Sequence, residues 1–276
     1  MKSATPLSRG RLSQFFAAFV IPLGLAGFGS LGQARAVAVD KELVLLVDVS
    51  QSGLNQKDFG SLLESYTSAF SSQQVLNSIQ SGKYGSIAVS LMTYGDSSVQ
   101  QVGIPWMSIA NAADAANFGS LAGKISKPNA AGFPAVSAAL VAASGSFGTE
   151  TGGKSNGFES SLQIIDVIAS VEPKSSNVGN DQESRKFSLL SGVDVINSIS
   201  LGKKAADIAA YFSANVIGSS RAGMTATSNT SNSIDANLTQ MLTTSLAGGI
   251  TAVPEPSAAA ALIVGSSLLL MRRRRA

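Results

Sequence analysis

Asp48, Ser50 and Ser52 are residues whose types and spacing suit the binding of a cation. They end the stretch LVLLVDVSQS, in which an apolar run is followed by a carboxylate and two hydroxyls at every second position. Along an extended segment this period of two directs all three side chains to one side. They can then occupy three positions around Mg²⁺, which prefers octahedral oxygen ligands. The alternative is that Asp48 is structural and hydrogen-bonds a neighbouring loop.

The absence of cysteine and histidine narrows the possible chemistry. Without them the chain lacks the commonest zinc ligands, the histidine general base and the Ser-His-Asp and Cys-His nucleophile systems. A metal site would have to use oxygen ligands, which favours magnesium, calcium or manganese. A glycoside hydrolase would need two carboxylates that converge in a cleft, and no spacing in the sequence shows such a pair. We therefore predict that the protein is not an enzyme.

A second motif, GTETGGKS at residues 148–155, fits the phosphate-binding pattern G-x-x-x-x-G-K-[ST]. In that motif a strand leads into the loop and a helix follows, so that backbone N–H groups surround the phosphates. Here an Ala-rich, helix-like segment precedes the motif, and Asn156-Gly157 is a poor start for a helix. We therefore interpret the motif as a Gly-rich surface loop.

Apolar patterning predicts strands that alternate with helices. Residues 42–49 are almost all Leu and Val, which is typical of a strand covered on both faces. Residues 55–79 carry apolar side chains spaced mostly by three, four or seven, which indicates an amphipathic helix that Asn55 can cap. Further strands are predicted at 86–94, 99–109, 162–171, 193–201 and, at an edge, 222–227, and further helices at 111–125, 134–143, 184–190, 205–214 and 234–246.

This alternation predicts an α/β fold with a mostly parallel, Rossmann-like sheet flanked by helices. A turn at residues 96–98 indicates that 86–94 and 99–109 pair as an antiparallel hairpin. In such sheets ligands bind beyond the carboxyl ends of the strands. Because Asp48, Ser50 and Ser52 follow strand 42–49, they lie at such an end.

The D-x-S-x-S motif after a buried strand resembles the metal-ion-dependent adhesion site of von Willebrand factor A (vWA) domains. The resemblance extends to IPWMSI at 104–109, FESSLQIIDV at 158–167, VDVINSISL at 193–201 and YFSANVIGSS at 211–220. In this order the segments are similar to an uncharacterised bacterial vWA-like family, the DUF1194 type. The resemblance covers most of residues 40–248 and implies a domain that binds when a partner's carboxylate completes the coordination of the metal.

The resemblance also implies ligands that this sequence does not supply. A second loop should offer a threonine, but residues 131–134 read AGFP and place Phe133 there. A third loop should offer an aspartate, and that position falls at Ser170, while Glu172 could lend a carboxylate if the loop bends differently. Asp166 lies within the strand and is expected to be structural. The resemblance therefore predicts a degenerate site that binds magnesium, calcium or manganese weakly.

Residues 1–36 have the order of a secretory signal peptide. Lys2, Arg9 and Arg11 precede an apolar stretch at 15–28, and Ala34-Arg35-Ala36 supplies the small residues that a signal peptidase accepts. We expect cleavage to release a body that begins near Val37.

Residues 251–276 contain a Pro-Glu-Pro triplet at 254–256, an apolar segment at 258–271 and four arginines at 272–275. This arrangement resembles the PEP-CTERM sorting signal, which implies an exosortase as a processing partner and release or attachment outside a bacterial cell. The apolar segment is short for a transmembrane helix, which needs about 20 residues. The arginines would hold the tail on the cytoplasmic side. We therefore expect a transient anchor in the inner membrane and an exported body.

The processed body has a charge opposite to that of the whole chain. The chain carries 20 Lys and Arg against 17 Asp and Glu, but eight of the basic residues lie in the two end segments. Residues 37–256 hold 12 basic and 17 acidic residues, a net charge of minus 5. Nucleic acid is therefore not an expected partner.

Residues 37–250 are thus predicted to form a vWA-like domain. The predicted function is a secreted or surface-sorted binding or adhesion module of the bacterial envelope or extracellular matrix, with an unknown protein or polysaccharide ligand. The alternatives are a structural matrix protein without a metal, and an extracellular hydrolase.

Overall fold

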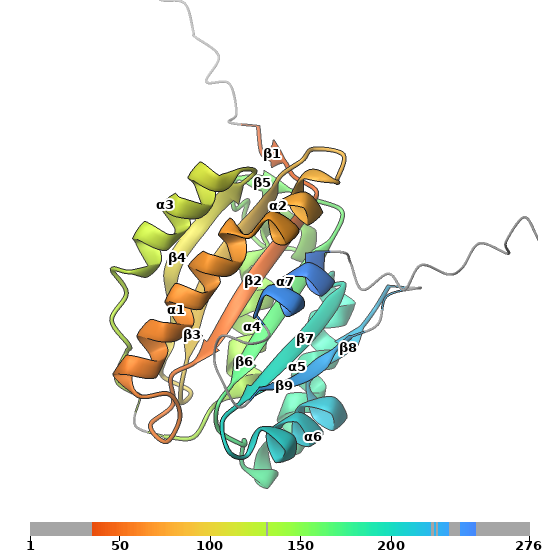
Figure 1. Ribbon diagram of the computed structural model, residues 1–276. Helices are drawn as coiled ribbons and strands as arrows, with labels where there is room; N and C mark the ends of the chain where they lie inside the picture. The colour runs from red at the N-terminus through yellow and green to blue at the C-terminus, as the bar shows by residue number, and fades with distance from the viewer. Residues whose placement is uncertain (1–34, 131, 222–223, 225, 232–237, 247–276) are drawn as a thin grey trace, which may run out of the picture. The chain divides into compact units, whose positions relative to one another are not determined.

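The computed structural model describes residues 35–130, 132–221, 224, 226–231 and 238–246 (Figure 1). Residues 1–34 of the predicted signal peptide and the whole predicted sorting signal at 251–276 lie outside these ranges. Within them, none of the helices has the length and apolar character needed to cross a membrane.

A seven-stranded, mostly parallel sheet forms the centre of the predicted body (Figure 1). Its strands, in spatial order, are β4 (Gln100–Ile109), β3 (Ile87–Tyr94), β2 (Lys41–Asp48), β6 (Gln163–Ala169), β7 (Val195–Leu201) and β8 (Gly218–Ser219), and β9 (Ser228–Ser231) also pairs with β7. Strands β3, β2, β6, β7 and β9 run parallel, whereas β4 and β8 are antiparallel to their neighbours. The predicted fold class and the predicted β3–β4 hairpin are confirmed.

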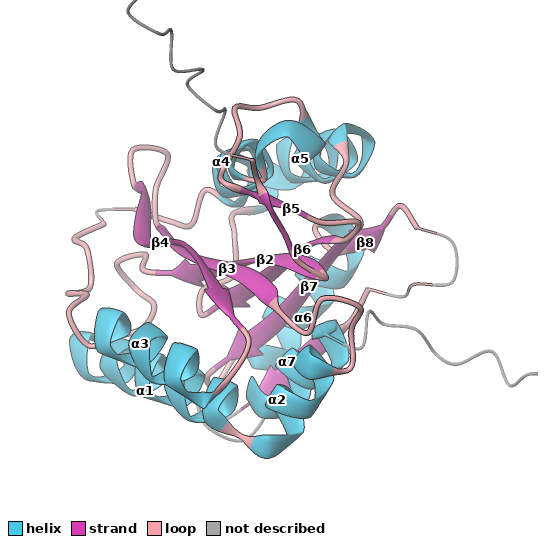
Figure 2. Cartoon of the chain, turned by 90° about the horizontal axis from the view of Figure 1, so that it is seen from above, coloured by secondary structure: helices cyan, strands magenta, loops and turns pink. Residues whose placement is uncertain are grey.

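Helices cover both faces of the sheet, as Figure 2 shows. One face packs against α1 (Gln56–Ser71), α2 (Gln73–Gln80), α3 (Ala112–Ala122) and α7 (Leu238–Leu246), and the other against α4 (Val136–Ser146), α5 (Val178–Ser191) and α6 (Ala205–Asn215). Asn55 caps α1 through its side chain, as the sequence predicts. Of the two caps that the sequence offers for α3, Asn111 and Asp114, the structure uses Asn111.

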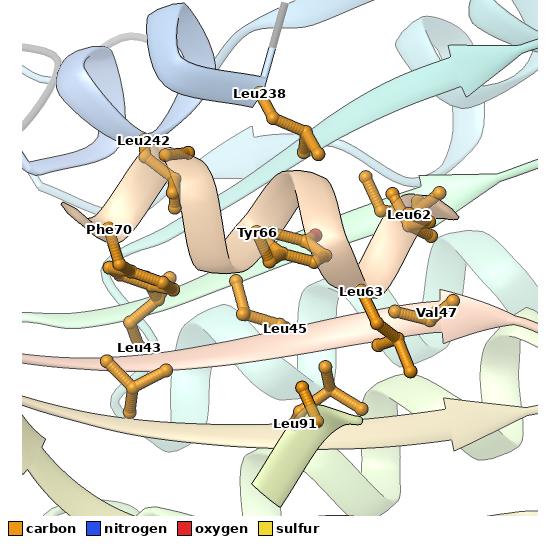
Figure 3. Close-up of a cluster of buried hydrophobic side chains, with 14 of the residues drawn as sticks. Leu43, Leu45, Val47, Leu62, Leu63, Tyr66, Phe70, Leu91, Leu238 and Leu242 are labelled. Atoms are coloured by element: carbon orange, nitrogen blue, oxygen red, sulfur yellow. The ribbon is translucent and has the colours of Figure 1, made fainter. Parts of the chain in front are cut away.

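The alternation of side chains along β2 builds the two cores. Leu43, Leu45 and Val47 belong to one apolar cluster and Val44 and Leu46 to the other, and all five are buried. Figure 3 shows Tyr66 and Phe70 of α1 packed over Leu43 and Leu45, with Leu242 of α7 beside them. Burying one such side chain contributes about 1.5–3 kcal/mol. The strand that carries Asp48 at its end is thereby held from both sides.

Some predicted boundaries are wrong. The single helix predicted at 55–79 is two helices, because Ser72 is extended at φ −70° and ψ 141° and its hydroxyl caps α2 at Val75 N–H. Serine competes with helical hydrogen bonding in this way. Helix α5 starts at Val178, earlier than the predicted 184–190. The edge strand predicted at 222–227 lies partly outside the described residues, and β9 begins at Ser228.

The sequence pattern missed the shortest strands. Val37–Ala38 forms β1 and pairs in parallel with β5 (Phe158–Glu159), apart from the main sheet. The third short strand is β8. Two residues are too few to show the period of two on which the prediction of a strand depends.

Candidate functional site

Asp48 is the last residue of β2, and its carboxylate joins two loops at the carboxyl edge of the sheet. The side chain is fully buried. Its Oδ1 accepts hydrogen bonds from the N–H and the hydroxyl of Ser50, at 2.9 and 2.5 Å. Its Oδ2 accepts from the N–H and the hydroxyl of Ser170, at 3.0 and 2.8 Å, and from the N–H of Val171 at 3.0 Å. Asp48 therefore does hydrogen-bond a neighbouring loop, as the alternative interpretation expects.

The loops after β2 and β6 approach each other closely beside Asp48. A Cβ atom on Gly53 would lie 2.3 Å from the Ser170 hydroxyl oxygen and 3.2 Å from Cγ2 of Val171, so a larger residue would not fit without movement. A third segment joins them, because Lys127 Nζ donates to the carbonyl oxygen of Val49 at 2.7 Å. The sequence analysis did not predict this contact between Lys127 and Val49, the residue that follows Asp48.

The donors around Asp48 do not fit a divalent cation as they stand. A carboxylate offers about four lone-pair sites, and five protein donors already point at Asp48. Three of these donors are backbone N–H groups, which cannot turn away as a side chain can. Ser50 is buried, whereas Ser52 is exposed. Across the ranges that the structure describes, no three Asp, Glu, His or Cys side chains form a group that could hold a metal ion.

A cavity of about 790 Å³ opens above this edge of the sheet. We call it the edge cavity. Its walls come from the loops after β2, β6 and β7, from the segment before α4, and from the first turns of α1 and α6, and they include Ser52, Phe133, Ser170, Glu172, Lys203 and Lys204. Asp48 and Ser50 do not line it. The predicted site residues are thus divided between a buried cluster and a cavity, with Ser170 common to both.

Both signs of charge occur at the edge cavity. Asp58 and Glu172 supply carboxylates, and Lys203 and Lys204 supply ammonium groups. The Lys174 ammonium lies 4.6 Å from the centre of the Phe133 ring. Sequence reasoning missed Lys203 and Lys204, although their position directly after strand 193–201 could have indicated them.

Asp166 lies outside the edge cavity, in the middle of β6. It is fully buried, and it accepts hydrogen bonds from Asn197 Nδ2 at 2.9 Å and from the Ser245 hydroxyl at 2.9 and 2.8 Å. Burial raises the pKa of Asp166 to about 6, although these two donors oppose the rise. The contacts join β6, β7 and α7, which agrees with the predicted structural role.

Two carboxyl groups that the sequence did not bring together converge at the opposite edge of the sheet. Burial raises the pKa of Glu42 to about 7, and Glu150 adds to the rise through a hydrogen bond and its charge. Asn156 Nδ2 and the Ser160 hydroxyl donate to Glu42 at 2.5 and 2.9 Å. Glu42 is fully buried and does not line the edge cavity, and its contacts link β2 to the Gly-rich loop.

The GTETGGKS motif forms no phosphate cradle. Gly148–Thr151 is a short 3₁₀ helix that follows α4, so the motif does not leave a strand. The N–H groups of Gly152 and Gly153 donate to Thr149 O at 3.1 Å and Gly148 O at 2.6 Å, within the loop itself. Lys154 is exposed. The prediction of a surface loop is confirmed.

The amino-acid sequence of this chain matches a known protein family. The sequence profile described as "Protein of unknown function (DUF1194)" matches residues 38–248. No curated protein matches the chain.

Solved structures with a similar fold include proximal thread matrix protein 1 from the mussel byssus, at a TM-score of 0.50 and 13% identity, over 78% of this chain and 48% of that chain. A second structure of that protein, with a zinc-occupied metal-ion-dependent adhesion site, has a TM-score of 0.48 and 13% identity, over 76% and 46%. A von Willebrand factor type A structure from Catenulispora acidiphila has a TM-score of 0.44 and 11% identity, over 77% and 43%. This chain spans about half the length of each of these structures.

Proposed function

Since the chain belongs to the DUF1194 family and has a vWA-like fold, we propose that it is a binding module that holds its partner in the edge cavity. The observation that carries this proposal is the cavity of about 790 Å³ beyond the carboxyl ends of β2, β6 and β7. Ligand cavities of about 300–1,000 Å³ at this edge are usual for α/β sheets. The role in adhesion or in a matrix follows from the vWA-like fold, and it is our inference for this chain.

Binding without catalysis fits the groups that face the edge cavity. The chain has no histidine or cysteine to act as base or nucleophile. Of the two carboxylates in the cavity walls, Asp58 accepts a hydrogen bond from Asn55 Nδ2 at 2.8 Å as part of the cap of α1. The other, Glu172, is exposed. Neither has the buried, paired arrangement that tunes a carboxylate for acid or base catalysis.

We propose further that recognition does not depend on a cation. The carboxylate of Asp48 accepts the hydrogen bonds that hold the loops after β2 and β6 together. Its proposed role is therefore to fix the positions of these two loops, which line the cavity. Metal binding by Asp48, Ser50 and Ser52, with Ser170 or Glu172, stays a prediction from the sequence. The next experiment separates the two possibilities.

A cation that binds the folded state raises the melting temperature. Since we propose that the native residues bind none, adding magnesium, calcium or manganese to about 5 mM is expected to leave the melting temperature unchanged. The double variant Phe133→Thr with Ser170→Asp is expected to gain a cation-dependent rise. In that variant a second carboxylate beside Asp48 needs a counter-charge, and a tenfold excess of metal over Kd would add about 1.4 kcal/mol. Calorimetry and thermal melts measure both effects. A rise in the parent that disappears in Asp48→Ala would show that the native residues do bind metal.

Export is part of the proposal. We propose that residues 1–36 are removed by a signal peptidase, and that residues 251–276 are processed by an exosortase after a transient stay in the inner membrane. The position of β1 agrees with the first cleavage, since β1 begins at Val37 and the Val37 N–H donates to Gly157 O at 2.8 Å. An α-amino group at Val37 could make the same bond. The mature protein would then act in the bacterial envelope or extracellular matrix.

Mass spectrometry of the extracellular fraction tests the export proposal. We expect the first residue to be Val37 or Val39, and no peptide from residue 258 onward in cells with an active exosortase. Deleting the exosortase should leave the tail on the protein and keep it with the membranes. Secreted protein that retains the arginines at 272–275 would contradict the sorting step.

Filling the edge cavity tests the binding proposal. Ser61 of α1 lines the cavity, and Ser61→Trp would occupy it. The protein purified from its producing cells should bind matrix from the same cells, and Ser61→Trp should retain less than about a tenth of this binding. Gln74→Trp, at an exposed position of α2, is the matched control and should bind as the parent does. Equal binding by both variants would contradict recognition in the edge cavity.

A further inference from the structure

Lys203 and Lys204 place two ammonium groups, without an ion-pair partner among the described residues, at the edge cavity. Both follow β7, both are exposed, and both line the cavity. In the part of the chain that the structure describes, neither ammonium group has an ion-pair or hydrogen-bond partner. Helix α6 starts directly after them, at Ala205, and no side chain caps its first turn. Two cations at one place favour an anionic ligand group, even though Asp207 adds a negative charge to the first turn of α6.

Phe133 gives the same cavity an aromatic surface. Half of its side chain is exposed, at 50%, although it is one of the largest apolar residues in the chain. The Lys174 ammonium lies 4.6 Å from the ring centre, which places a further positive charge at this ring. An exposed ring in a cavity with polar walls can stack on the C–H face of a sugar ring, whereas it adds nothing to a metal site.

The net charge of the body opposes the binding of an anion, and the lysines at the edge cavity reduce this effect at one place. Residues 37–256 have a net charge of minus 5, so a polyanion is repelled by the molecule as a whole. Three lysines at or beside the edge cavity offset this repulsion locally. The carboxylates of Asp58 and Glu172, also in the cavity walls, can accept hydrogen bonds from sugar hydroxyls.

From these observations we propose that the edge cavity binds an acidic polysaccharide whose sugar units carry carboxylates. The carboxylates pair with Lys203 and Lys204, and a sugar ring stacks on Phe133. This inference rests on the proposed binding function and names the ligand class of that site. At Phe133 and Ser170, where the family resemblance implies metal ligands, this chain offers none of the expected groups, and lysine supplies the positive charge of the proposed site.

The test compares a uronate polymer with its neutral ester. Oligomers of polygalacturonate and of alginate are titrated into the protein purified from its producing cells, together with methyl-esterified polygalacturonate, which keeps the sugar rings and loses the charge. We expect a uronate to bind at least about tenfold more tightly than the ester. Raising the salt concentration from about 50 mM to about 500 mM should weaken this binding, because salt screens exposed charges.

Matched variants locate the binding. Lys203→Gln with Lys204→Gln, and separately Phe133→Ala, should each weaken uronate binding about tenfold or more. Lys186→Gln and Phe187→Ala are the controls, since both residues lie exposed on α5 and Phe187 is 54% exposed. Thermal melts show whether each variant is folded, and Lys204→Gln alone provides a second, milder change.

Several outcomes would overturn the proposal. These are no binding of any uronate, equal binding of acid and ester, uronate binding that survives all the cavity variants, or preferred binding of a poly-aspartate peptide. In each case the proposed binding function stands if Ser61→Trp still abolishes retention by the matrix. If Ser61→Trp has no effect either, the proposed function fails together with the inference.

Discussion

Replacing Asp48 by alanine is expected to lower the free energy of unfolding by about 3–5 kcal/mol, because several buried hydrogen-bond donors lose their acceptor. The N–H groups of Ser50, Ser170 and Val171 would lose their acceptor while they stay close to the sheet. Each buried donor left without a partner costs about 1–3 kcal/mol, and the two hydroxyls can turn to other acceptors. Urea unfolding measures the loss.

The dependence of this loss on cations separates the two roles considered for Asp48. If Asp48 is a hydrogen-bond acceptor between loops, the loss is the same in a chelator and in about 5 mM magnesium. If Asp48 is a metal ligand, most of the loss appears only with the metal present. Asp207→Ala, at an exposed position of α6, is a matched control and should change stability by no more than about 0.5 kcal/mol.

Asp166→Asn is expected to stabilise the protein increasingly as the pH rises. The folded-state pKa of Asp166 is raised to about 6 from 3.8, mainly by burial. The folded state therefore binds more protons than the unfolded state between these values, so the stability present at low pH is lost as the pH rises through about 6. One pKa unit corresponds to about 1.4 kcal/mol, so ionised Asp166 lowers stability by about 3 kcal/mol at neutral pH. Asparagine removes this charge.

The measurement is the difference in unfolding free energy between Asp166→Asn and the parent. This difference should increase by about 2 kcal/mol between about pH 4.5 and about pH 7.5, whatever the asparagine gains or loses in hydrogen bonds. Adding Ser245→Ala to Asp166→Asn is a control, because it removes a hydroxyl that contacts Asp166 without restoring a charge. A difference that stays constant with pH would contradict the raised pKa.

The sequence predicted much of the fold because the signals for it are local. The Leu and Val run of β2 and the Asn55 and Asn111 caps each depend on neighbours within a few residues. The order of strands and helices then restricts the sheet to a mostly parallel one, and the absence of cysteine and histidine restricts the chemistry directly. The places where these signals failed, the break at Ser72 and the two-residue strands, lack any period long enough to recognise.

The candidate site, in contrast, was decided by contacts between distant segments. The D-x-S-x-S motif by itself is compatible with a cation site or with a loop anchor. The tertiary structure shows that it anchors a loop, because Ser170 and Val171, more than 120 residues away along the chain, place their N–H groups on Asp48. Gly53 permits that approach, since any Cβ there would meet the Ser170 hydroxyl.

Tertiary structure alone also assembled the edge cavity and the buried polar groups. Phe133 and Lys203 belong to loops far apart in sequence, and they line one cavity because parallel strands end at the same edge of the sheet. Asp166 meets Ser245 only because α7 returns to cover β6 and β7. Glu42 meets Glu150 because the Gly-rich loop folds over the start of β2. Periodicity determines which side chains point inward, but it carries no information on which distant partner each one meets there, because that depends on how the sheet and helices pack.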